Sequence, residues 1–499
     1  MSPDTSPPNT TIESITGAFD AQILGTTTMN DRELIADYVI VGAGAVGMAF
    51  ADTLLDNSDA SMIVIDRREK AGGLWNDAYS FVRLHGPALY YGVNSKQLGS
   101  ESKEETGLNR GLYELATGAE LKDYFESTMR DRLLPSGRVT FLSSSEYNNG
   151  VVTSLKSGEK VSVRARKKLV DATYADTRQP STHAPNFAVS ESAFCVTPND
   201  LPQKFNSEAG YAVIGSGKTA MDTVTWLLEH GVASEKITWV RPRDTWVLNR
   251  KHVQPKYEFL EQMFSSRAFE MEAACAATSL QDFFDRLEGV GILQRLDKNV
   301  MPTMYRCSIC SEAEVEQLRQ VTNVIRLGHV QWIGGDRLVL QKGTVSMPRG
   351  TIYVNCTADG IPDRAPQPIY QKDKIVLQYV RRCSPTFSGA FVAYLETIIN
   401  DNDAKNAMCT PVPPPQVPLD WIRMLLQESG NQVTWSKIPA LQQWLMNSRL
   451  DRFSALVARA HAEKDEPKLA AYQRFRSSVK AGLTRLTQMI AHENQKKAA

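Results

Sequence analysis

Asp37-Tyr-Val-Ile-Val-Gly42-Ala-Gly44-Ala-Val-Gly47 and Tyr211-Ala-Val-Ile-Gly215-Ser-Gly217-Lys-Thr-Ala220 are the two stretches that decide the fold. Each has a β-branched apolar run before a glycine-rich turn and a helical pattern after it, as a dinucleotide-binding unit requires. Glycine permits the tight turn and lets backbone N–H groups approach a pyrophosphate at the positive end of the helix. One such turn can arise by chance, but two in the right context predict two dinucleotide-binding domains of α/β fold.

An acid follows the first turn at the position where a ribose needs it. The strand predicted over 61–65 ends on Asp66, whose carboxylate can accept hydrogen bonds from both ribose hydroxyls. We therefore expect this unit to bind the first nucleotide through Gly42, Gly44, Ala45, Val46, Gly47 and Asp66.

Basic residues follow the second turn instead. The strand predicted over 236–240 ends on Arg241-Pro-Arg243, with no acid at its tip. Two guanidinium groups would pair with a 2′-phosphate that a carboxylate would repel, so this site is interpreted as NADPH rather than NADH. The alternative is that both arginines are solvated loop charges. The other expected contacts are Gly215, Ser216, Gly217, Lys218, Thr219 and Ala220. Two nucleotides on one chain indicate a flavin, FAD at the first site, reduced by the nicotinamide at the second.

The stretch 212–219 also fits a relaxed phosphate-loop pattern. A nucleoside triphosphate loop needs several residues between strand and helix, whereas the apolar strand here runs through Ile214 and leaves only a tight turn. An NTPase is therefore disfavoured.

The composition agrees with an intracellular enzyme of several domains. The 499 residues carry 56 basic and 56 acidic side chains, and 42% are hydrophobic. Without a basic excess, nucleic-acid binding is disfavoured. The most apolar stretch, 38–55, contains the first glycine turn and Asp52, so we interpret it as a buried strand and helix, not a membrane span. The lack of a secretion signal pattern and the scattered cysteines suit a cytoplasmic protein.

Cys307-Ser-Ile-Cys310 raises the alternative of a redox-active dithiol. In the thioredoxin-reductase pattern such a pair lies just before the NADPH turn, and here it lies far after it. Ser311-Glu-Ala-Glu314 has the spacing of a capping box and predicts a helix over 315–321. We therefore expect structural cysteines in a loop that enters this helix. Zinc would need two further ligands, so no metal site is expected.

Further motifs between the two turns resemble the flavin-containing monooxygenase superfamily. Asp66 is followed by Arg67-Arg-Glu-Lys-Ala-Gly-Gly73-Leu74-Trp75, similar to the Gly-Gly-x-Trp segment that passes the flavin in that superfamily. The segments 168–174 and 351–358 resemble the strand ends that bound its NADPH insertion, and the resemblance covers roughly residues 36–410. It implies that Arg67, Gly73, Leu74 and Trp75 contact FAD, although Trp75 suits a core anchor equally well.

One motif of that superfamily is missing. Members that oxygenate amines, sulfides or ketones usually carry Phe-x-Gly-x-x-x-His just before the NADPH turn. The equivalent stretch here, 187–198, has neither its glycine nor its histidine. Fold and cofactors therefore transfer from the resemblance more readily than the particular chemistry.

Three residues are candidates for catalysis. His85 can act as a general acid or base near neutral pH, although a lone histidine is more often structural. The resemblance implies that Asn94 hydrogen-bonds the oxygenated flavin. Arg83 either orients a substrate carboxylate or the flavin, or closes a surface ion pair.

The expected domain order follows from the positions of the glycine turns and of the proline-rich stretch along the chain. We expect a flexible tail over 1–35, a discontinuous FAD-binding Rossmann-like domain over 36–204 and 323–410, and an inserted NADPH-binding Rossmann domain over 205–322. A proline-rich linker over 411–418 precedes a helical C-terminal region over 419–499.

The function expected from these features is that of an NADPH-dependent FAD monooxygenase. It would transfer one oxygen atom of O2 to a small organic molecule through a flavin hydroperoxide. The first alternative is an FAD/NADPH oxidoreductase, either a dehydrogenase or a redox-neutral flavoenzyme, that does not oxygenate. The second is a non-catalytic FAD-binding protein. The oligomeric state is not predicted.

Overall fold

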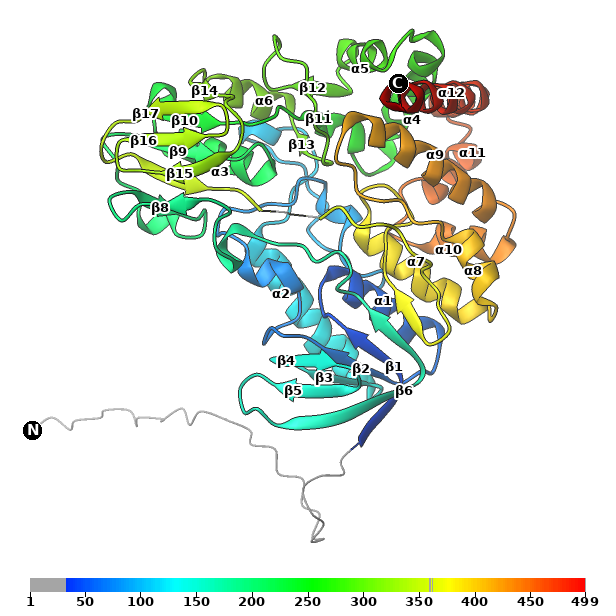
Figure 1. Ribbon diagram of the computed structural model, residues 1–499. Coiled ribbons are helices and arrows are strands. Elements are labelled where there is room, and N and C mark those ends of the chain that lie inside the picture. The colour runs from blue at the N-terminus through cyan, green and yellow to red at the C-terminus, as the bar shows by residue number, and fades with distance from the viewer. Residues whose placement is uncertain (1–32, 359, 361, 499) are drawn as a thin grey trace, which may run out of the picture.

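The computed structural model describes residues 33–358, 360 and 362–498. It consists of a parallel sheet with its helices, a second parallel sheet with its own helices, and a group of helices from the last part of the chain (Figure 1). The α/β fold with two such sheets and a helical C-terminal region is the one that the sequence predicts. Most of the expected tail lies outside the described residues, and residues 33–35 begin the first strand.

The first sheet has seven strands. Five are parallel, in the order β3 (Val139–Leu142), β2 (Met62–Ile65), β1 (Glu33–Val41), β6 (Lys160–Asp171) and β19 (Lys374–Val376). The other two, β5 (Val151–Ser154) and β4 (Ser145–Asn148), extend it in antiparallel fashion beside β6. The carboxyl ends of the five parallel strands meet at one edge, where an α/β sheet binds its ligands.

Helix α1 (Ala45–Asn57) follows β1, and α7 (Pro385–Ile398), which is buried over most of its length, packs against it. The two backbones approach closely because α7 contains Gly389, where a Cβ would lie 2.5 Å from the carbonyl oxygen of Val46. Helix α2 (Gly118–Thr128) begins at a capping box formed by Thr117 and Glu120. The core of this part includes Phe50, Phe125 and Phe387.

The second sheet has five parallel strands. Their order is β14 (Val324–Ile325), β10 (Ile237–Val240), β9 (Tyr211–Ile214), β18 (Ile352–Asn355) and β8 (Phe194–Val196). Alternate residues of β9 face two different cores: Val213 packs in the core that contains α3 (Lys218–Glu229) and α6 (Glu312–Arg319), and Ala212 packs in another.

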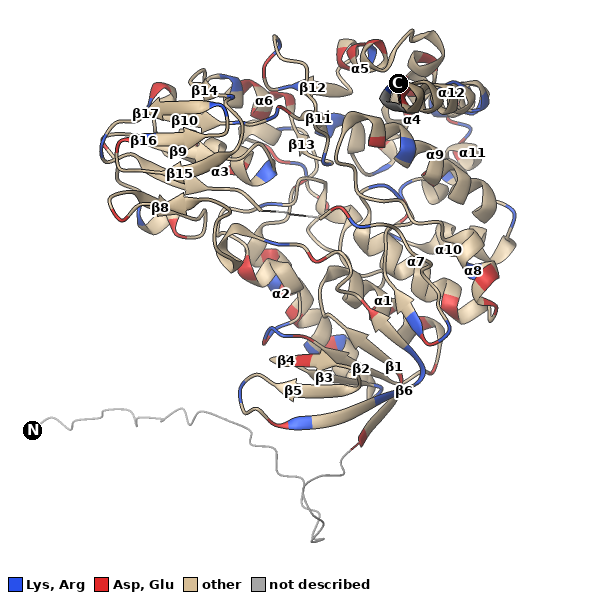
Figure 2. Ribbon diagram, in the orientation of Figure 1, with Lys and Arg blue, Asp and Glu red and all other residues tan. Residues whose placement is uncertain are grey.

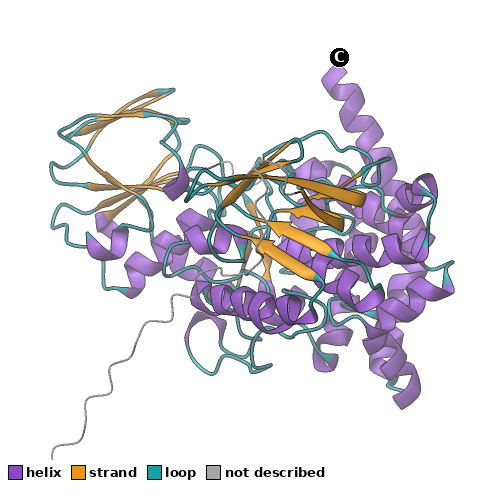
Figure 3. Ribbon diagram, turned by 90° about the horizontal axis from the view of Figure 1, so that it is seen from below, coloured by secondary structure: helices purple, strands orange, loops and turns teal. Residues whose placement is uncertain are grey.

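The core around Ala212 is closed by a four-stranded sheet that faces the second sheet (Figure 3). Its strands are β17 (Gly343–Ser346), β16 (Arg337–Leu340), β15 (Val330–Ile333) and β7 (Ala188–Val189). The hairpin between β15 and β16 turns at residues 334–336.

The sheet pairing draws the domain boundaries differently from the expected ones. We expected β8 in the first FAD-binding segment and β14 and β18 in the returning one, but all three belong to the second sheet. The reason is that β18 pairs in parallel with both β8 and β9, so the inserted unit takes strands from both sides of 205–322. Only β19 and the elements after it return to the first sheet.

The remaining strands and helices join these parts. A small sheet is formed by β11 (Trp246–Asn249), β12 (Leu293–Arg295) and β13 (Ile309–Cys310). The further helices are α4 (Leu260–Ala276), α5 (Leu280–Gly289), α8 (Asn402–Met408), α9 (Pro418–Trp435), α10 (Pro439–Asn447), α11 (Ser454–Glu463) and α12 (Glu466–Ala498).

The helical character predicted for the C-terminal region is confirmed. The proline-rich segment runs without helix or strand to Val417, and α9 begins at Pro418. Helix α12 lies along α4 of the inserted unit, whereas Trp435 and Trp444 of α9 and α10 pack on Phe387 and Phe391 of α7 (Figure 1). The C-terminal helices thus contact both other parts.

Acidic and basic residues are interspersed over all parts of the molecule in the view of Figure 2. Among the described helices, none combines the length and apolar character needed to cross a membrane.

Candidate functional site

The first glycine turn lies at the carboxyl edge of the first sheet. Gly42 adopts a φ of 105°, which favours glycine, and its N–H donates to the carbonyl of Ile65 at 2.8 Å. A Cβ on Gly47 would lie 2.0 Å from the Gly42 carbonyl oxygen, so this glycine is required for the helix to pack on the turn. No side chain caps the N-terminus of α1. Its first N–H groups, at Ala45 and Val46, are therefore placed to bind an anion.

Gly44, by contrast, is not required for packing. Its φ of −74° is ordinary for any residue. The nearest atom to an added Cβ is Cα of Gly73, at 3.7 Å. A side chain at position 44 would therefore project over the anion-binding N-terminus of α1 without a clash inside the protein.

Asp66 holds this turn in shape. One carboxylate oxygen accepts the N–H of Ala43 at 2.7 Å, and the other accepts the N–H of Arg68 at 2.8 Å. The side chain is only 6% exposed. Asp66 thus stands at the tip of β2 beside the turn, as its sequence position predicts, while Arg67 is exposed.

The Gly-Gly-Leu-Trp segment lies directly against the glycine turn. The N–H of Gly72 donates to the Ala43 carbonyl at 2.8 Å, and a Cβ on Gly73 would come within 2.7 Å of Gly44 Cα. The short helix η1 (Gly73–Asp77) then places Leu74 against the core and buries Trp75, whose indole N–H donates to Tyr91 Oη at 3.0 Å. The structure therefore brings together the residues predicted for the first nucleotide.

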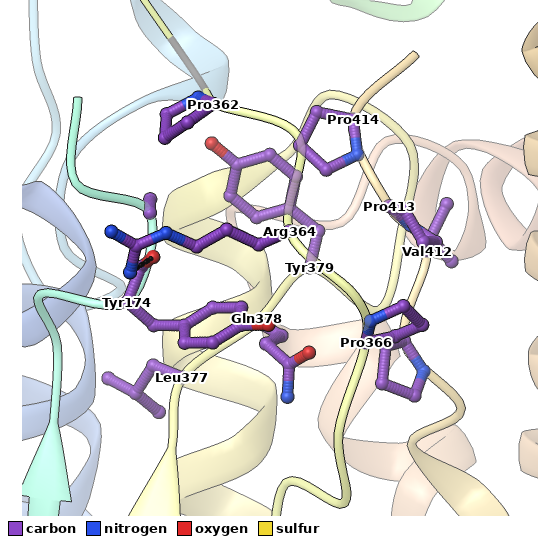
Figure 4. Close-up of a pocket in the computed structure, with 12 residues that line it drawn as sticks. Tyr174, Pro362, Arg364, Pro366, Leu377, Gln378, Tyr379, Val412, Pro413 and Pro414 are labelled. Atoms are coloured by element: carbon purple, nitrogen blue, oxygen red, sulfur yellow. Dashed lines mark hydrogen bonds between the residues drawn. The ribbon is translucent and has the colours of Figure 1, made fainter. Parts of the chain in front are cut away.

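A pocket opens at the same edge of the sheet, beyond the ends of β6 and β19 (Figure 4). It holds about 430 Å³, including space open to solvent. Tyr174, Tyr379, Arg364 and several prolines line it, and Arg364 is tethered to the Tyr174 carbonyl at 2.9 Å and to Asp176 at 2.8 Å. A dinucleotide with its pyrophosphate at Gly44 would extend one half toward Asp66 on one side and the other half toward this pocket.

The second glycine turn repeats the first. Gly215 has a φ of 138° and donates its N–H to the Val240 carbonyl at 3.0 Å. Gly217 begins α3 with a φ of −88° and has no atom within 4 Å of an added Cβ, and no side chain caps the helix. Ser216, Gly217 and Thr219 are partly exposed and Ala220 is buried. This turn can therefore also accept a pyrophosphate.

Lys218 has a different environment from the one expected. Its ammonium group forms an ion pair with Asp222, one turn along α3, and Asp222 also accepts the hydroxyl of Tyr79 at 2.7 Å. Tyr79 belongs to the first domain, so Lys218 faces the interface between the domains.

The arginines at the tip of β10 differ from each other. Arg241 is buried; it forms an ion pair with Asp244 at 3.2 Å and stacks on Trp239 at 4.7 Å. Burial lowers the pKa of Arg241 to about 10. Arg243 is exposed, and no ion pair to it forms within the part of the chain that the structure describes.

The sequence reading missed Arg326, which follows β14 at the same edge. It forms ion pairs with Asp244 at 2.7 Å and Asp297 at 2.9 Å. The sequence contained an indication of this position, because Arg326 directly follows the apolar pair Val324-Ile325, as a residue at the end of a strand would. Only the pairing of β14 with β10, however, brings it near Arg243.

The three catalytic candidates do not meet. His85 lies deep between the domains, and burial, reinforced by the charges of Lys218 and Arg250, lowers its pKa to about 3. Its Nδ1 has no hydrogen-bond partner in the described structure. Asn94 accepts a hydrogen bond from Ser448 Oγ at 2.8 Å, next to the C-terminal helices. Arg83 forms an ion pair with Glu104 at 2.6 Å.

A buried polar cluster next to His85 fixes the two domains together. Arg250 is fully buried and donates to Glu314 at 2.7 Å and to the carbonyl of His85 at 3.0 Å. Asn109 of the first domain donates to the same Glu314 at 3.2 Å. Glu314 also completes the predicted capping box with Ser311, and α6 begins at Glu312, earlier than the predicted range of 315–321.

Cys307 and Cys310 precede α6, as expected, but Cys310 lies in β13 and not in a loop, and the two cysteines are not joined to each other. Cys307 forms a disulfide with Cys383, 76 residues away, with a Cα–Cα distance of 6.5 Å. Cys310 is buried in β13, and burial raises the pKa of its thiol to about 12. Two cysteines joined across domains cannot be recognised from local spacing. Within the described residues, no three His, Cys, Asp or Glu side chains gather as a metal site.

The fold and the two turns define a protein with two dinucleotide-binding units. No family model matches the chain. It is 43% identical over 427 residues to the uncharacterized protein Rv2000 of Mycobacterium tuberculosis, covering 85% of this chain and 79% of that protein, and equally so to the uncharacterized protein Mb2023 of Mycobacterium bovis. The chain belongs to the family of these mycobacterial proteins.

Similar solved structures are more distant. A polycyclic ketone monooxygenase from Thermothelomyces thermophila is 10% identical with a TM-score of 0.49, and the match covers 92% of this chain and 90% of that one. A flavin-containing monooxygenase from Stenotrophomonas maltophilia is 12% identical with a TM-score of 0.43, covering 73% and 97%. At such TM-scores these similarities do not define the chemistry of this protein.

Proposed function

We propose that this protein is an NADPH-dependent FAD monooxygenase that transfers one oxygen atom of O2 to a small organic molecule. The observation that carries the proposal is the pair of glycine turns. Each lies at the carboxyl edge of its own parallel sheet, and each opens a helix whose N-terminus is uncapped. Two anion-binding turns in one chain suit a pair of dinucleotides, one of which passes electrons to the other.

The first site fits FAD. Gly44 leaves room at the N-terminus of α1, Asp66 is placed for a ribose, and the pocket beyond β6 and β19 lies where the other half of the dinucleotide would extend. Bound there, FAD would supply the capacity to accept two electrons and react with O2. Tyr379 presents an aromatic ring to that pocket.

The second site fits NADPH. Gly217 leaves the N-terminus of α3 open, and Arg243 and Arg326 stand at the adjacent strand tips, where a 2′-phosphate would lie. His85 is neutral near pH 7, because its pKa is about 3. It can therefore accept a proton or a hydrogen bond at Nδ1, but it does not act as a cation there.

Two glycine substitutions test the cofactor assignment without disturbing the fold. Gly44→Ala should give protein that folds normally, because the new methyl group meets only Gly73 at 3.7 Å. The protein should lack flavin, because the methyl group would occupy the space proposed for the FAD pyrophosphate. Gly217→Ala should retain flavin and lose reduction by NADPH. Its methyl group meets no protein atom within 4 Å and would occupy the space proposed for the NADPH pyrophosphate. Each is the control for the other. Flavin absorbance, NADPH-dependent bleaching and the melting temperature are the measurements. A fully flavinated Gly44→Ala protein with normal NADPH reduction would contradict the first site.

Oxygen transfer itself needs a separate experiment. Purified protein is reduced by NADPH without oxygen and then mixed with oxygenated buffer in a stopped-flow spectrometer. A transient absorbance distinct from oxidised and reduced flavin supports monooxygenation. Direct reoxidation with release of peroxide supports the alternative of an FAD/NADPH oxidoreductase without oxygenation, which the missing Phe-x-Gly-x-x-x-His motif favours. Absence of any reduction by NADPH supports the non-catalytic alternative.

A further inference from the structure

Four arginines converge in the interior where the inserted unit, the first domain and the C-terminal helices meet. Arg267 lies on α4, Arg381 and Arg382 precede α7, and Arg452 lies between α10 and α11. We call this set the arginine cluster. Helix α4 carries both acidic and basic residues (Figure 2). Three acids lie beside the arginine cluster: Glu270 on α4, Glu428 on α9 and Asp451 before α11.

The acids do not balance the arginines. Asp451 pairs with Arg381 at 2.8 Å, and Arg382 pairs with Glu428 at 2.8 Å and Glu270 at 3.6 Å. Three carboxylates face four guanidinium groups, so one positive charge is in excess. Burying a charge without a counter-ion is costly, and an excess of this kind marks a place for an anion.

The two arginines without an acid are Arg267 and Arg452. Neither forms an ion pair within residues 33–358, 360 and 362–498. Arg267 stacks on the ring of Phe453 at 4.3 Å. Arg452 donates to Ser384 Oγ at 2.8 Å and lies over the ring of Tyr90 at 5.0 Å. Their remaining N–H groups are available to a ligand.

Arg381 and the N-terminus of α7 both add positive potential to the region of the arginine cluster. The Arg381 side chain is 4% exposed; its Nε faces Glu428 in an ion pair at 3.9 Å without a hydrogen bond, and its Nη1 has no hydrogen-bond partner in the described structure. Its guanidinium plane covers Phe387 at 3.6 Å, so only the edge of the group is free. The N-terminus of α7 begins at Ser384 without a side-chain cap, and its dipole adds to the positive potential.

The arginine cluster is largely buried, but two of its side chains keep some exposure to solvent. Burial lowers the pKa of Arg267 to about 10 and also lowers that of Arg452, although both side chains keep some solvent-accessible surface. Tyr90 has the same character, since burial raises its pKa while part of the side chain stays accessible. Arg267, Arg452 and Tyr90 thus all keep a partly accessible surface.

We propose that the arginine cluster binds the carboxylate of an organic acid, so that the substrate of this protein is a carboxylic acid whose anionic end lies between Arg267, Arg381 and Arg452. This inference rests on the proposed function, because it names the substrate class of the same enzyme. A singly charged carboxylate matches the single excess charge, whereas a phosphate dianion would leave one negative charge uncompensated.

The test compares ligands on the full-length protein as purified with its flavin. Melting temperatures and titration calorimetry are recorded with acetate and benzoate, with neutral benzamide as the shape control and with inorganic phosphate as the dianion. Acetate and benzoate should bind and raise the melting temperature, and benzamide should not. Binding of phosphate in preference to both carboxylates, or no binding of either carboxylate, would overturn the proposal.

Substitutions separate a binding site from a structural cluster. Arg452→Gln and Arg267→Gln should each weaken benzoate at least tenfold, which corresponds to the loss of one charge-assisted contact. Neither should lower the melting temperature without ligand, because neither leaves an acid unpaired. Arg474→Gln, which removes an exposed ion pair between Arg474 on α12 and Glu272 on α4, is the matched control and should leave benzoate binding unchanged.

Two outcomes of this comparison would refute the cluster as a binding site. The first is a ligand-free melting temperature of Arg452→Gln well below that of Arg474→Gln, which would show that the guanidinium group is structural. The second is unchanged benzoate affinity in both cluster variants. Flavin content and NADPH reduction, measured on the same proteins, report separately on the proposed function, so a failure there is distinguishable from a failure here.

Discussion

Replacing Arg243 with alanine should weaken NADPH and leave NADH unaffected. Arg243 is exposed at the tip of β10 and has no ion pair with any described residue, so its whole charge is available to a 2′-phosphate. Its neighbours are less free. Arg241 is held by Asp244 and Trp239, and Arg326 divides its charge between Asp244 and Asp297.

The magnitude follows from this difference. A charge-assisted hydrogen bond contributes about 1.5–3 kcal/mol, and solvent screening of an exposed group reduces this to about 1–2 kcal/mol. The expected rise in the dissociation constant of NADPH is therefore roughly 5- to 30-fold. Arg326→Ala should also weaken NADPH, because it leaves the carboxylates of Asp244 and Asp297 without this partner, and these would repel a 2′-phosphate.

The assay is the rate of anaerobic flavin reduction as a function of NADPH or NADH concentration, which yields a dissociation constant for each. Arg349→Ala is the control, because Arg349 is an exposed arginine of the same unit with its side chain 89% exposed. The effect of Arg243→Ala should shrink at high ionic strength. Equal losses for NADPH and NADH, or none for either, would refute the assignment of the 2′-phosphate to this strand tip.

Three further predictions concern stability. Gly47→Ala should lower the melting temperature and, unlike Gly44→Ala, impair folding, because its Cβ would lie 2.0 Å from the Gly42 carbonyl oxygen; overpacking costs about 1–3 kcal/mol or more. Arg250→Met should destabilise by about 3–5 kcal/mol in a denaturant titration, because Glu314 would be left buried without its partner, and adding Glu314→Met should restore much of the loss. The pKa of His85 is about 3, below the unfolded value of about 6.5. The unfolded chain therefore binds a proton between these values that the native protein does not. Stability should fall as the pH drops from 6.5 toward 3, by up to ~1.4 kcal/mol per pH unit, and His85→Asn should reduce this slope. An unchanged slope in that variant would show that other groups cause it.

Local patterns predicted the parts of the fold that depend on local physics. The strand ends before Gly42 and Gly215 and the capping box of Ser311 and Glu314 involve residues close together in the chain, and the structure confirms all three. The same holds for the helical spacing beyond Pro418.

Features that depend on distant pairing could not be predicted in this way. A parallel strand carries no mark of its partner, so nothing near β18 shows that it pairs with β9 and not with the first sheet. Arg326 comes to lie beside the tip of β10 only through such a pairing. Asp222 could be foreseen as a partner of Lys218, because it lies one helical turn further along the chain. Tyr79, which donates a hydrogen bond to Asp222, comes from another domain and could not be foreseen.

The disulfide between Cys307 and Cys383 ties the inserted unit to the residue just before the start of α7. A swing of that unit as a rigid body about its two connecting segments would therefore have to carry the beginning of α7 with it. Reduction of the bond would release this tether and leave the non-covalent contacts, among them those around Arg250 and Asp222 and the packing of α12 on α4, to hold the unit in place. With the disulfide formed, the second nucleotide site is thus covalently attached to the segment before the helix that packs against α1, the helix that opens the first site.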